Sequence, residues 1–395
     1  MPITIDGTGT ITGATTLAST VASPTFTTPA LGTPASGILT SCTGVPFNGF
    51  KNRIINGAMV IDQRNAGASV TLNNGDEKFP VDRFSTYQNT GTGVVTAQQS
   101  STAPTGFTNS IKLTTTTANA SLSAAQRWQF LQSIEGYNTA DLGFGTANAQ
   151  TVNLSFWVYS SLTGTFAGSL NNSAVDRSYV FNYTISNANT WEQKTITIAG
   201  DTSGTWVGAT NGIGIRVYLS LGAGTNYNTT AGSWATGFYT STSGATSVVG
   251  TNGATFYITG VQLEKGSTAS SFDYRPFGTE LILAQRYFET TYPIGTAVGT
   301  ASTDASAPVA FSMGDSSAVT QQIIWIYKVK KCSAPTVTVY NPNSGASGSA
   351  RYAGTLNINF STQGSRVDQA TFGSGTGGMA INNTFSYYMT ANSEL

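Results

Sequence analysis

The chain has 395 residues, of which only 9% are charged; 18 basic side chains balance 18 acidic ones, and histidine is absent. Zero net charge provides no long-range attraction to nucleic acid or to an anionic membrane surface, so neither is an expected partner. Without histidine the chain lacks the commonest general base and transition-metal ligand, which excludes every Ser–His and Cys–His catalytic arrangement. Hydrophobic residues at 39% suffice for cores, and this length predicts more than one domain.

Residues 1–47 carry almost no charge and consist of short Thr, Ser, Pro and Gly units such as TGTITG (8–13) and TPALGTP (28–34). This composition has too little apolar bulk for a core of its own. We expect an extended stalk that orders by winding against copies of itself, with a reach of about 150 Å at full extension. The start MPITID lacks the features of a secretory signal and no stretch suits a membrane span, so we expect assembly in a cytoplasm without membrane insertion. The two cysteines, Cys42 and Cys332, are expected to be free thiols.

From residue 48 onward the sequence pattern predicts β-strands. Apolar residues occupy every second position in residues 152–158 and again in residues 213–221, which is the period of a half-buried strand. Turn-rich segments separate such runs at spacings typical of an antiparallel sandwich. In FYITGVQL (256–263) the apolar parity changes at Gly260, and a β-bulge there would place all four apolar residues on one face.

A second β domain is predicted after a polar and aromatic link at residues 272–279. Residues 280–286 could form one or two helical turns with Thr279 as the N-cap. Strand-like runs follow at residues 323–329, 336–340 and 356–360. The predicted organisation is therefore all-β: a stalk at 1–47, an antiparallel sandwich at 48–277 and a smaller β domain at 278–395.

Carboxylates are the one class of catalytic group that the composition leaves available. A glycosidase needs only a pair of Asp or Glu side chains at a suitable separation, but no spacing in this sequence selects a pair. The available carboxylates are Glu135, Asp141, Asp176, Glu192, Asp201, Glu264, Asp273, Glu280, Asp304 and Asp315. We expect no enzyme and no cofactor, although a structural calcium ion near Asp76 and Glu77, or near Asp201, stays open on ligand type.

Aromatic residues in turn-rich stretches are candidates for stacking on sugar rings, with neighbouring amides and hydroxyls as hydrogen-bonding partners. They include Tyr227, Phe238, Tyr239, Trp191, Trp206 and Trp234, each of which could equally belong to a core; Trp157 and Trp191 are expected to pack. The C-terminal loop at residues 340–345, together with residues 351–352, is less tied to a strand than the other aromatic stretches. We therefore place the candidate ligand-binding residues there. These are Tyr340, Asn341, Asn343, Arg351 and Tyr352.

Several stretches, taken together and in order, resemble a module that recurs in tail fibre proteins of tailed bacteriophages. They cover more than half of the chain: NRIINGAM (52–59) with QR (63–64), VDRF (81–84), QSIEGY (132–137), LSFWV (154–158), GVQLEKG (260–266), and RPFGTE (275–280) with QRYF (285–288). The resemblance implies a jelly roll similar to carbohydrate-binding modules, a homotrimer, and attachment of a virion to its host. It supplies no catalytic residue.

The resulting hypothesis is a virion fibre protein that binds host-surface glycan. Its expected partners are two further copies of itself, other virion proteins of the baseplate, tail or capsid through the N-terminus, and a cell-surface glycan. Three weak sites in a trimer would gain avidity. Two alternatives stay open: a fibre that degrades polysaccharide through a carboxylate pair, and a purely structural decoration of the capsid or tail.

Overall fold

A computed structural model describes residues 50–302, 309–311, 322–352, 356–374 and 384–395. The predicted stalk, Cys42, Asp304 and Asp315 lie outside the described residues. Residues 49–395 form one compact unit. The predicted boundary after residue 277 therefore stays a prediction.

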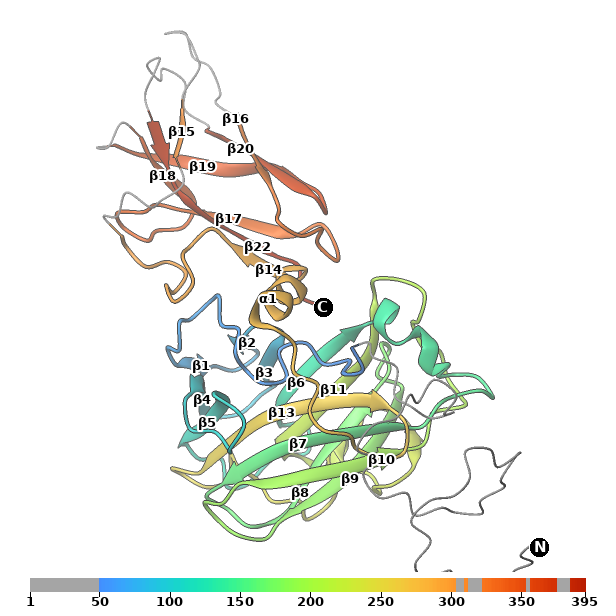
Figure 1. The fold of residues 1–395 in the computed structure, drawn as a ribbon. Helices are drawn as coiled ribbons and strands as arrows, with labels where there is room; N and C mark the ends of the chain where they lie inside the picture. The colour runs from blue at the N-terminus through green and yellow to red at the C-terminus, as the bar shows by residue number, and fades with distance from the viewer. Residues whose placement is uncertain (1–49, 303–308, 312–321, 353–355, 375–383) are drawn as a thin grey trace, which may run out of the picture. The chain divides into compact units, whose positions relative to one another are not determined.

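The first part of this unit is a sandwich of two antiparallel sheets, as the strand pattern predicted (Figure 1). One sheet has six strands in the order β1 (Val70–Leu72), β4 (Val94–Ser100), β5 (Ser110–Thr117), β13 (Thr255–Lys265), β7 (Val152–Ser160) and β10 (Glu192–Ile198). The facing sheet has seven strands, in the order β12 (Trp234–Thr236), β9 (Arg177–Ile185), β8 (Gly164–Asn171), β11 (Ile213–Ala223), β6 (Arg127–Glu135), β3 (Phe84–Gln88) and β2 (Glu77–Val81). Neighbouring strands are often distant in sequence, as in a jelly roll.

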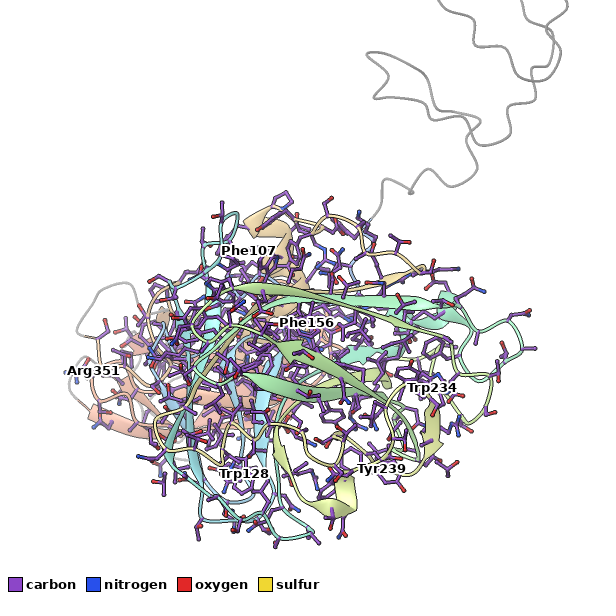
Figure 2. All side chains as sticks on the ribbon, turned by 90° about the horizontal axis from the view of Figure 1, so that it is seen from below. Phe107, Trp128, Phe156, Trp234, Tyr239 and Arg351 are labelled. Atoms are coloured by element: carbon purple, nitrogen blue, oxygen red, sulfur yellow. The ribbon has the colours of Figure 1, made fainter. Side chains whose placement is uncertain are left out.

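The core lies between these sheets, because alternate side chains of each strand point inward. Trp128 and Phe156, both marked in Figure 2, are almost completely buried there together with Phe130 and Phe166. The alternate residues Val152, Leu154, Phe156 and Val158 all belong to this core, which confirms the period-2 prediction for β7.

The predicted bulge is present at Gly260. The pairing of β13 with β7 shifts register between Thr259 and Gln262, and Gly260 has a φ of +62°. The apolar residues on both sides of the shift, Phe256, Ile258, Val261 and Leu263, are all buried in the same core. A Cβ at Gly260 would lie 2.7 Å from the Phe107 ring, so both the backbone angle and the space require glycine.

After the sandwich, α1 (Phe277–Gln285) begins three residues before the predicted helical turns. Thr279 is not the N-cap: Pro276 occupies that position in an extended conformation, and its carbonyl accepts the N–H of Glu280 at 3.0 Å. The Pro276 carbonyl thus accepts the first hydrogen bond of the helix, which is the role of the residue directly before a helix. Within the described residues, none of the helices has the length and apolarity needed to span a membrane. Besides α1, the described helices are single turns: η1 (Gly136–Asn138), η2 (Ala140–Leu142) and η3 (Thr225–Tyr227).

Two further antiparallel sheets follow α1. One has three strands in the order β14 (Phe288–Thr290), β22 (Tyr388–Asn392) and β17 (Thr336–Tyr340). The other has the order β15 (Val309–Phe311), β21 (Thr384–Ser386), β18 (Ser349–Tyr352), β19 (Leu356–Ser365), β20 (Gln369–Ser374) and β16 (Gln322–Ile326). Their shared core contains Phe360, Phe372 and Phe385. The fold is thus all-β, as predicted.

The stretches that resemble the phage module have structural roles here. The Asn52 amide accepts the N–H groups of Ile54 and Leu263 and donates to the Val261 carbonyl. Gln132 likewise exchanges two hydrogen bonds, of 2.8 and 2.9 Å, with the backbone of Ile55. These bonds attach the segment before β1 to the sandwich.

Buried ion pairs connect the residues after 277 to the sandwich. Arg286 and the Tyr287 hydroxyl both donate to the Glu135 carboxylate, at 2.5 to 2.8 Å. Glu394 forms ion pairs with Arg64, at 3.0 Å, and with Arg83. Cys332, which is a free thiol as expected, is buried and its sulfur lies 2.7 Å from the Ser393 carbonyl.

Candidate functional site

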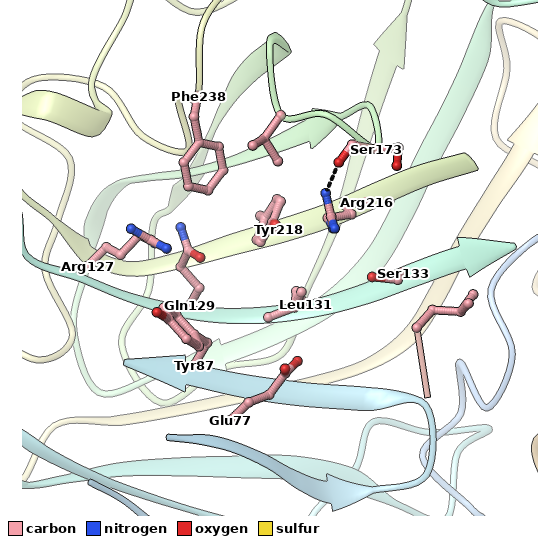
Figure 3. Close-up of a pocket in the computed structure, with 12 residues that line it drawn as sticks. Glu77, Tyr87, Arg127, Gln129, Leu131, Ser133, Ser173, Arg216, Tyr218 and Phe238 are labelled. Atoms are coloured by element: carbon pink, nitrogen blue, oxygen red, sulfur yellow. Dashed lines mark hydrogen bonds between the residues drawn. The ribbon is translucent and has the colours of Figure 1, made fainter. Parts of the chain in front are cut away.

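A cavity of about 430 Å³ lies on the outer face of the seven-stranded sheet, on the side away from the core (Figure 3). The outward residues of β2, β3, β6 and β11 that line it are polar or aromatic except Leu131. On β6, Trp128 and Phe130 face the core, and Arg127 and Gln129 face the cavity. The lining comprises Glu77, Tyr87, Arg127, Gln129, Leu131, Ser133, Ser173, Val175, Arg216, Tyr218, Phe238 and Leu395.

Aromatic rings surround the guanidinium of Arg127 at one end of the cavity. Its central carbon lies 5.0 Å from the ring centres of Tyr87 and Phe238 and 4.7 Å from that of Tyr227. One Nη donates to the Tyr227 hydroxyl at 2.6 Å. The buried Nε has no partner among the described residues. The rings hold the side chain in place by cation–π contact and leave a hydrogen-bond donor available.

Gln129, next to Arg127 on the same face, is only 1% exposed. Its amide Nε2 is buried and finds no hydrogen-bond acceptor in the described part of the chain. Burying an unsatisfied amide costs about 1–3 kcal/mol. A polar ligand in the cavity would recover that cost by accepting from Nε2.

Tyr218 lies between Arg127 and Arg216 in Figure 3. Burial raises the pKa of its phenol to about 12, so the hydroxyl keeps its proton at neutral pH and can donate. Arg216 donates to the Ser173 carbonyl at 2.7 Å, which fixes its guanidinium at the far end of the cavity. Glu77 is exposed and pairs across the strands with Tyr87.

The cavity combines rings with hydrogen-bonding groups that have a fixed geometry. Aromatic faces pack against the C–H faces of sugar rings, and amides, phenols and guanidinium groups bind hydroxyl oxygens. A hydroxyl-rich ligand suits this lining, and an apolar one would leave Gln129 and Arg127 unsatisfied.

The carboxylates considered as catalytic candidates lie elsewhere. Of the eight that the structure describes, none lines the cavity, and several bind arginines: Asp201 pairs with Arg177 at 2.7 Å, and Glu280 with Arg275 at 3.1 Å. Burial opposes ionisation of Glu135, but hydrogen bonds from Arg286 and Tyr287 hold its pKa below its usual range. These groups are committed to structure, and the described lining contains the single acidic side chain Glu77.

No group of three or more Cys, Asp or Glu side chains within the described ranges could hold a metal ion. Asp76 forms an ion pair with Lys78 at 3.4 Å, and Asp201 is bound by Arg177. The structural calcium ion considered at these two places stays a prediction.

The predicted C-terminal site residues do not all face solvent. Asn341 is fully buried, and its amide donates to Asn357 at 2.8 Å. Tyr352 is 7% exposed and packs against Phe385. These two side chains therefore support the local fold.

The other three predicted residues are more accessible. Tyr340 is half-buried against Tyr292, at 6.0 Å between ring centres. With its amide oxygen turned toward Arg351, the exposed Asn343 accepts hydrogen bonds from the Arg351 guanidinium. The structure thus brings Asn343 and Arg351 together, and a ligand site at this loop stays a prediction.

The turn aromatics divide between cavity and packing. Phe238 lines the cavity and Tyr227 contacts Arg127. Trp206 and Trp234 contact Phe144 edge-on and pack against the core. Trp191 is half-buried beside Tyr159 and Tyr257, outside the six-stranded sheet. Trp157 is half-buried as well.

Sequence reasoning missed Arg127, Gln129, Arg216 and Tyr218. A signal was present: polar residues alternate with core aromatics along RWQF (127–130). The order of strands in the sheet, which joins these positions to β11 and β2, was not accessible from that pattern.

No protein-family model matches the chain, and no curated protein sequence matches it. Solved structures with similar folds include the enzymatically active domain of tailspike protein 4 from bacteriophage CBA120, at 12% identity and a TM-score of 0.28 over 54% of this chain and 21% of that one. A putative sugar binding protein from Bacteroides thetaiotaomicron is 13% identical, with a TM-score of 0.30, over 55% of this chain and 100% of that one.

A family 11 carbohydrate-binding module of Clostridium thermocellum is 12% identical, with a TM-score of 0.26, over 50% of this chain and 99% of that one. The chain thus spans about a fifth of the tailspike chain and nearly all of the two smaller proteins. Likenesses of this size do not assign a function. The functional argument depends on the cavity itself.

Proposed function

We propose that the chain binds a saccharide in the cavity on the outer face of the seven-stranded sheet. The observation that carries the proposal is the amide of Gln129, a lining residue of a cavity with aromatic rings, whose buried Nε2 has no partner in the described chain. A sugar hydroxyl supplies the missing acceptor, and Tyr87, Tyr218 and Phe238 supply the apolar surface that a sugar ring packs against.

The proposed role is binding without catalysis. Hydrolysis of a glycosidic bond by the two-carboxylate mechanism needs a pair of acidic side chains, and the described lining has Glu77 alone. A fibre that degrades polysaccharide would need its catalytic pair elsewhere.

The wider role that we propose is attachment of a bacteriophage to its host by a homotrimeric tail fibre. Its support is the sequence resemblance of residues 52–288 to phage fibre modules and the weakly charged Thr/Pro/Gly composition of residues 1–47. Light scattering of the full chain tests the trimer, and a stable monomer would contradict it. Virions without this chain should adsorb poorly, whereas normal adsorption would favour a purely structural decoration.

Binding of the full chain to immobilised bacterial polysaccharides tests the cavity. We expect Tyr218→Ala to weaken binding at least tenfold, because it removes a ring and a donor from the centre of the cavity. Trp191→Ala is the matched control, since Trp191 is a half-buried aromatic outside the other sheet; its binding should stay within about twofold.

Two outcomes would move or remove the site. If Arg351→Ala weakens binding and Tyr218→Ala does not, the site lies at the C-terminal loop. If the wild-type chain binds no polysaccharide, the proposed function is wrong.

A further inference from the structure

The eight arginines between residues 50 and 302 divide into two groups by their partners. Six of them form ion pairs with carboxylates. Five of these pairs, with Asp82, Asp141, Asp201, Glu135 and Glu280, have N–O distances up to 3.1 Å. The sixth arginine pairs with Glu394. They are Arg53, Arg64, Arg83, Arg177, Arg275 and Arg286. In contrast, Arg127 and Arg216 have no carboxylate within 4.0 Å in the described part of the chain.

Both arginines without a carboxylate line the same cavity. In a chain with 9% charged residues, two such cations in one cavity produce a local positive charge. Glu77 is the one acidic side chain of the described lining; it is exposed and forms no ion pair with either arginine. The charged side chains of the described lining are therefore two cations and one anion.

The two guanidinium groups are held ready at opposite ends of the cavity. Arg127 is fixed by three rings and by the Tyr227 hydroxyl, and Arg216 by the Ser173 carbonyl. Arg216 pairs with Ser133 across the strands, six residues from Arg127 along β6, which corresponds to about 20 Å of strand. Tyr218 and Gln129 lie along the face between them.

Arginine side chains bind carboxylate and phosphate oxygens better than neutral hydroxyls, because the planar fork offers two parallel charge-assisted hydrogen bonds. A neutral sugar would leave both positive charges uncompensated in a partly desolvated cavity. The separation of the two ends exceeds a single sugar unit and fits a short oligosaccharide.

We propose that the cavity recognises an acidic oligosaccharide, with anionic oxygens of the glycan on Arg127 and Arg216 and neutral hydroxyls on Gln129 and Tyr218. This inference rests on the proposed function and adds the chemical class of the ligand. The anionic oxygens can belong to a sugar carboxylate or to a phosphate substituent, and the experiment separates these sources.

The test uses the full chain and an array of bacterial polysaccharides, each spotted in native, carboxyl-reduced and dephosphorylated form. We expect binding to anionic polysaccharides and a loss of at least tenfold after one of the two treatments, which names the source. Equal binding to a polysaccharide after both treatments would overturn the acidic ligand and leave the saccharide site intact. Absence of binding to every form would overturn the proposed function as well.

Variants locate the charge contact. Arg127→Gln and Arg216→Gln should each weaken binding to the native polysaccharide about tenfold and weaken binding to the neutralised form by a clearly smaller factor. Arg366→Gln is the matched control, because Arg366 is exposed and lies outside the cavity. If both cavity variants bind as the control does, the proposal is wrong. Wild-type binding should also weaken as the salt concentration rises, because salt screens charge contacts. Binding that does not change with salt would contradict the proposal without any variant.

Discussion

Two groups of charged side chains in this protein differ in how their charge is compensated. Around α1 and the C-terminal strands, Lys331 pairs with Glu289 at 2.6 Å with both side chains fully buried, and Arg64 pairs with Asp82 at 2.7 Å. On the outer face of the seven-stranded sheet, Arg127 and Arg216 have only neutral protein partners. The charges of the first group are compensated within the fold, so these side chains maintain structure; the charges of the second group are those that we propose a ligand compensates.

The largest effect should follow from breaking a buried pair. Lys331→Met leaves the Glu289 carboxylate buried without its cation, although the Lys328 N–H still donates to it. We expect a loss of about 3–5 kcal/mol in the free energy of unfolding, measured by denaturant titration. Arg216→Met is the matched change in the cavity and should cost about 1 kcal/mol, since it removes only hydrogen bonds to the Asn172 and Ser173 carbonyls, of 3.4 and 2.7 Å.

A double variant checks the cause. Lys331→Met with Glu289→Gln removes both charges and should recover a large part of the stability, because the penalty comes from the uncompensated carboxylate. If the double variant is as unstable as Lys331→Met, the lost stability comes from packing.

Asp82 should give the compensated group a pH dependence. Burial raises its pKa to about 7, although Arg64 and Gln63 act in the opposite direction, and Glu394 and Asp62 raise it further. In the unfolded chain its pKa is about 3.9. Its contribution to stability is therefore fully present below about pH 4 and is lost as the pH rises through about 7, because the unfolded chain releases the proton first.

The measurement compares the wild type with Asp82→Asn between about pH 5.5 and 6.5, where the slope from one such group approaches about 1.4 kcal/mol per pH unit. The chain has no histidine to titrate in this window. We expect wild-type stability to fall by about 1 kcal/mol and the variant to change less. Equal slopes would show that Asp82 stays ionised beside Arg64.

The sequence predicted those features of the fold that depend on local pattern. The period-2 runs of β7 and β11 are strands, and the parity change at Gly260 is a bulge, because both follow from which face a side chain takes along one strand. The start of α1 was misplaced since Pro276, and not a polar side chain, precedes it. Partners such as Arg83 and Glu394 are 311 positions apart, and no local pattern pairs them.

The candidate site was less accessible than the fold for the same reason. Tyr227 and Phe238 were considered because they lie in turns, and both contact Arg127. Arg127, Gln129 and Tyr218 lie on strands at outward positions, where polar residues are ordinary. What marks Arg127 and Gln129 is a buried N–H group without a partner in the described chain, and that is a property of the assembled sheet.

The smallest expected change in stability is also the one that most sharply separates the two groups. Gln129→Leu replaces a buried amide whose Nε2 has no acceptor in the described chain with an apolar side chain of similar size. Removing an unsatisfied polar group is neutral or stabilising, so the free energy of unfolding should stay equal or rise by up to about 1 kcal/mol. Polysaccharide binding should weaken at least tenfold, because the donor to the sugar is gone.

Gln132→Leu, on the same strand, is the control: Gln132 exchanges two hydrogen bonds with Ile55, so its loss should destabilise the fold. If Gln129→Leu instead destabilises the chain as much as Gln132→Leu does, Gln129 belongs to the structure and the cavity loses the residue that makes it a binding site.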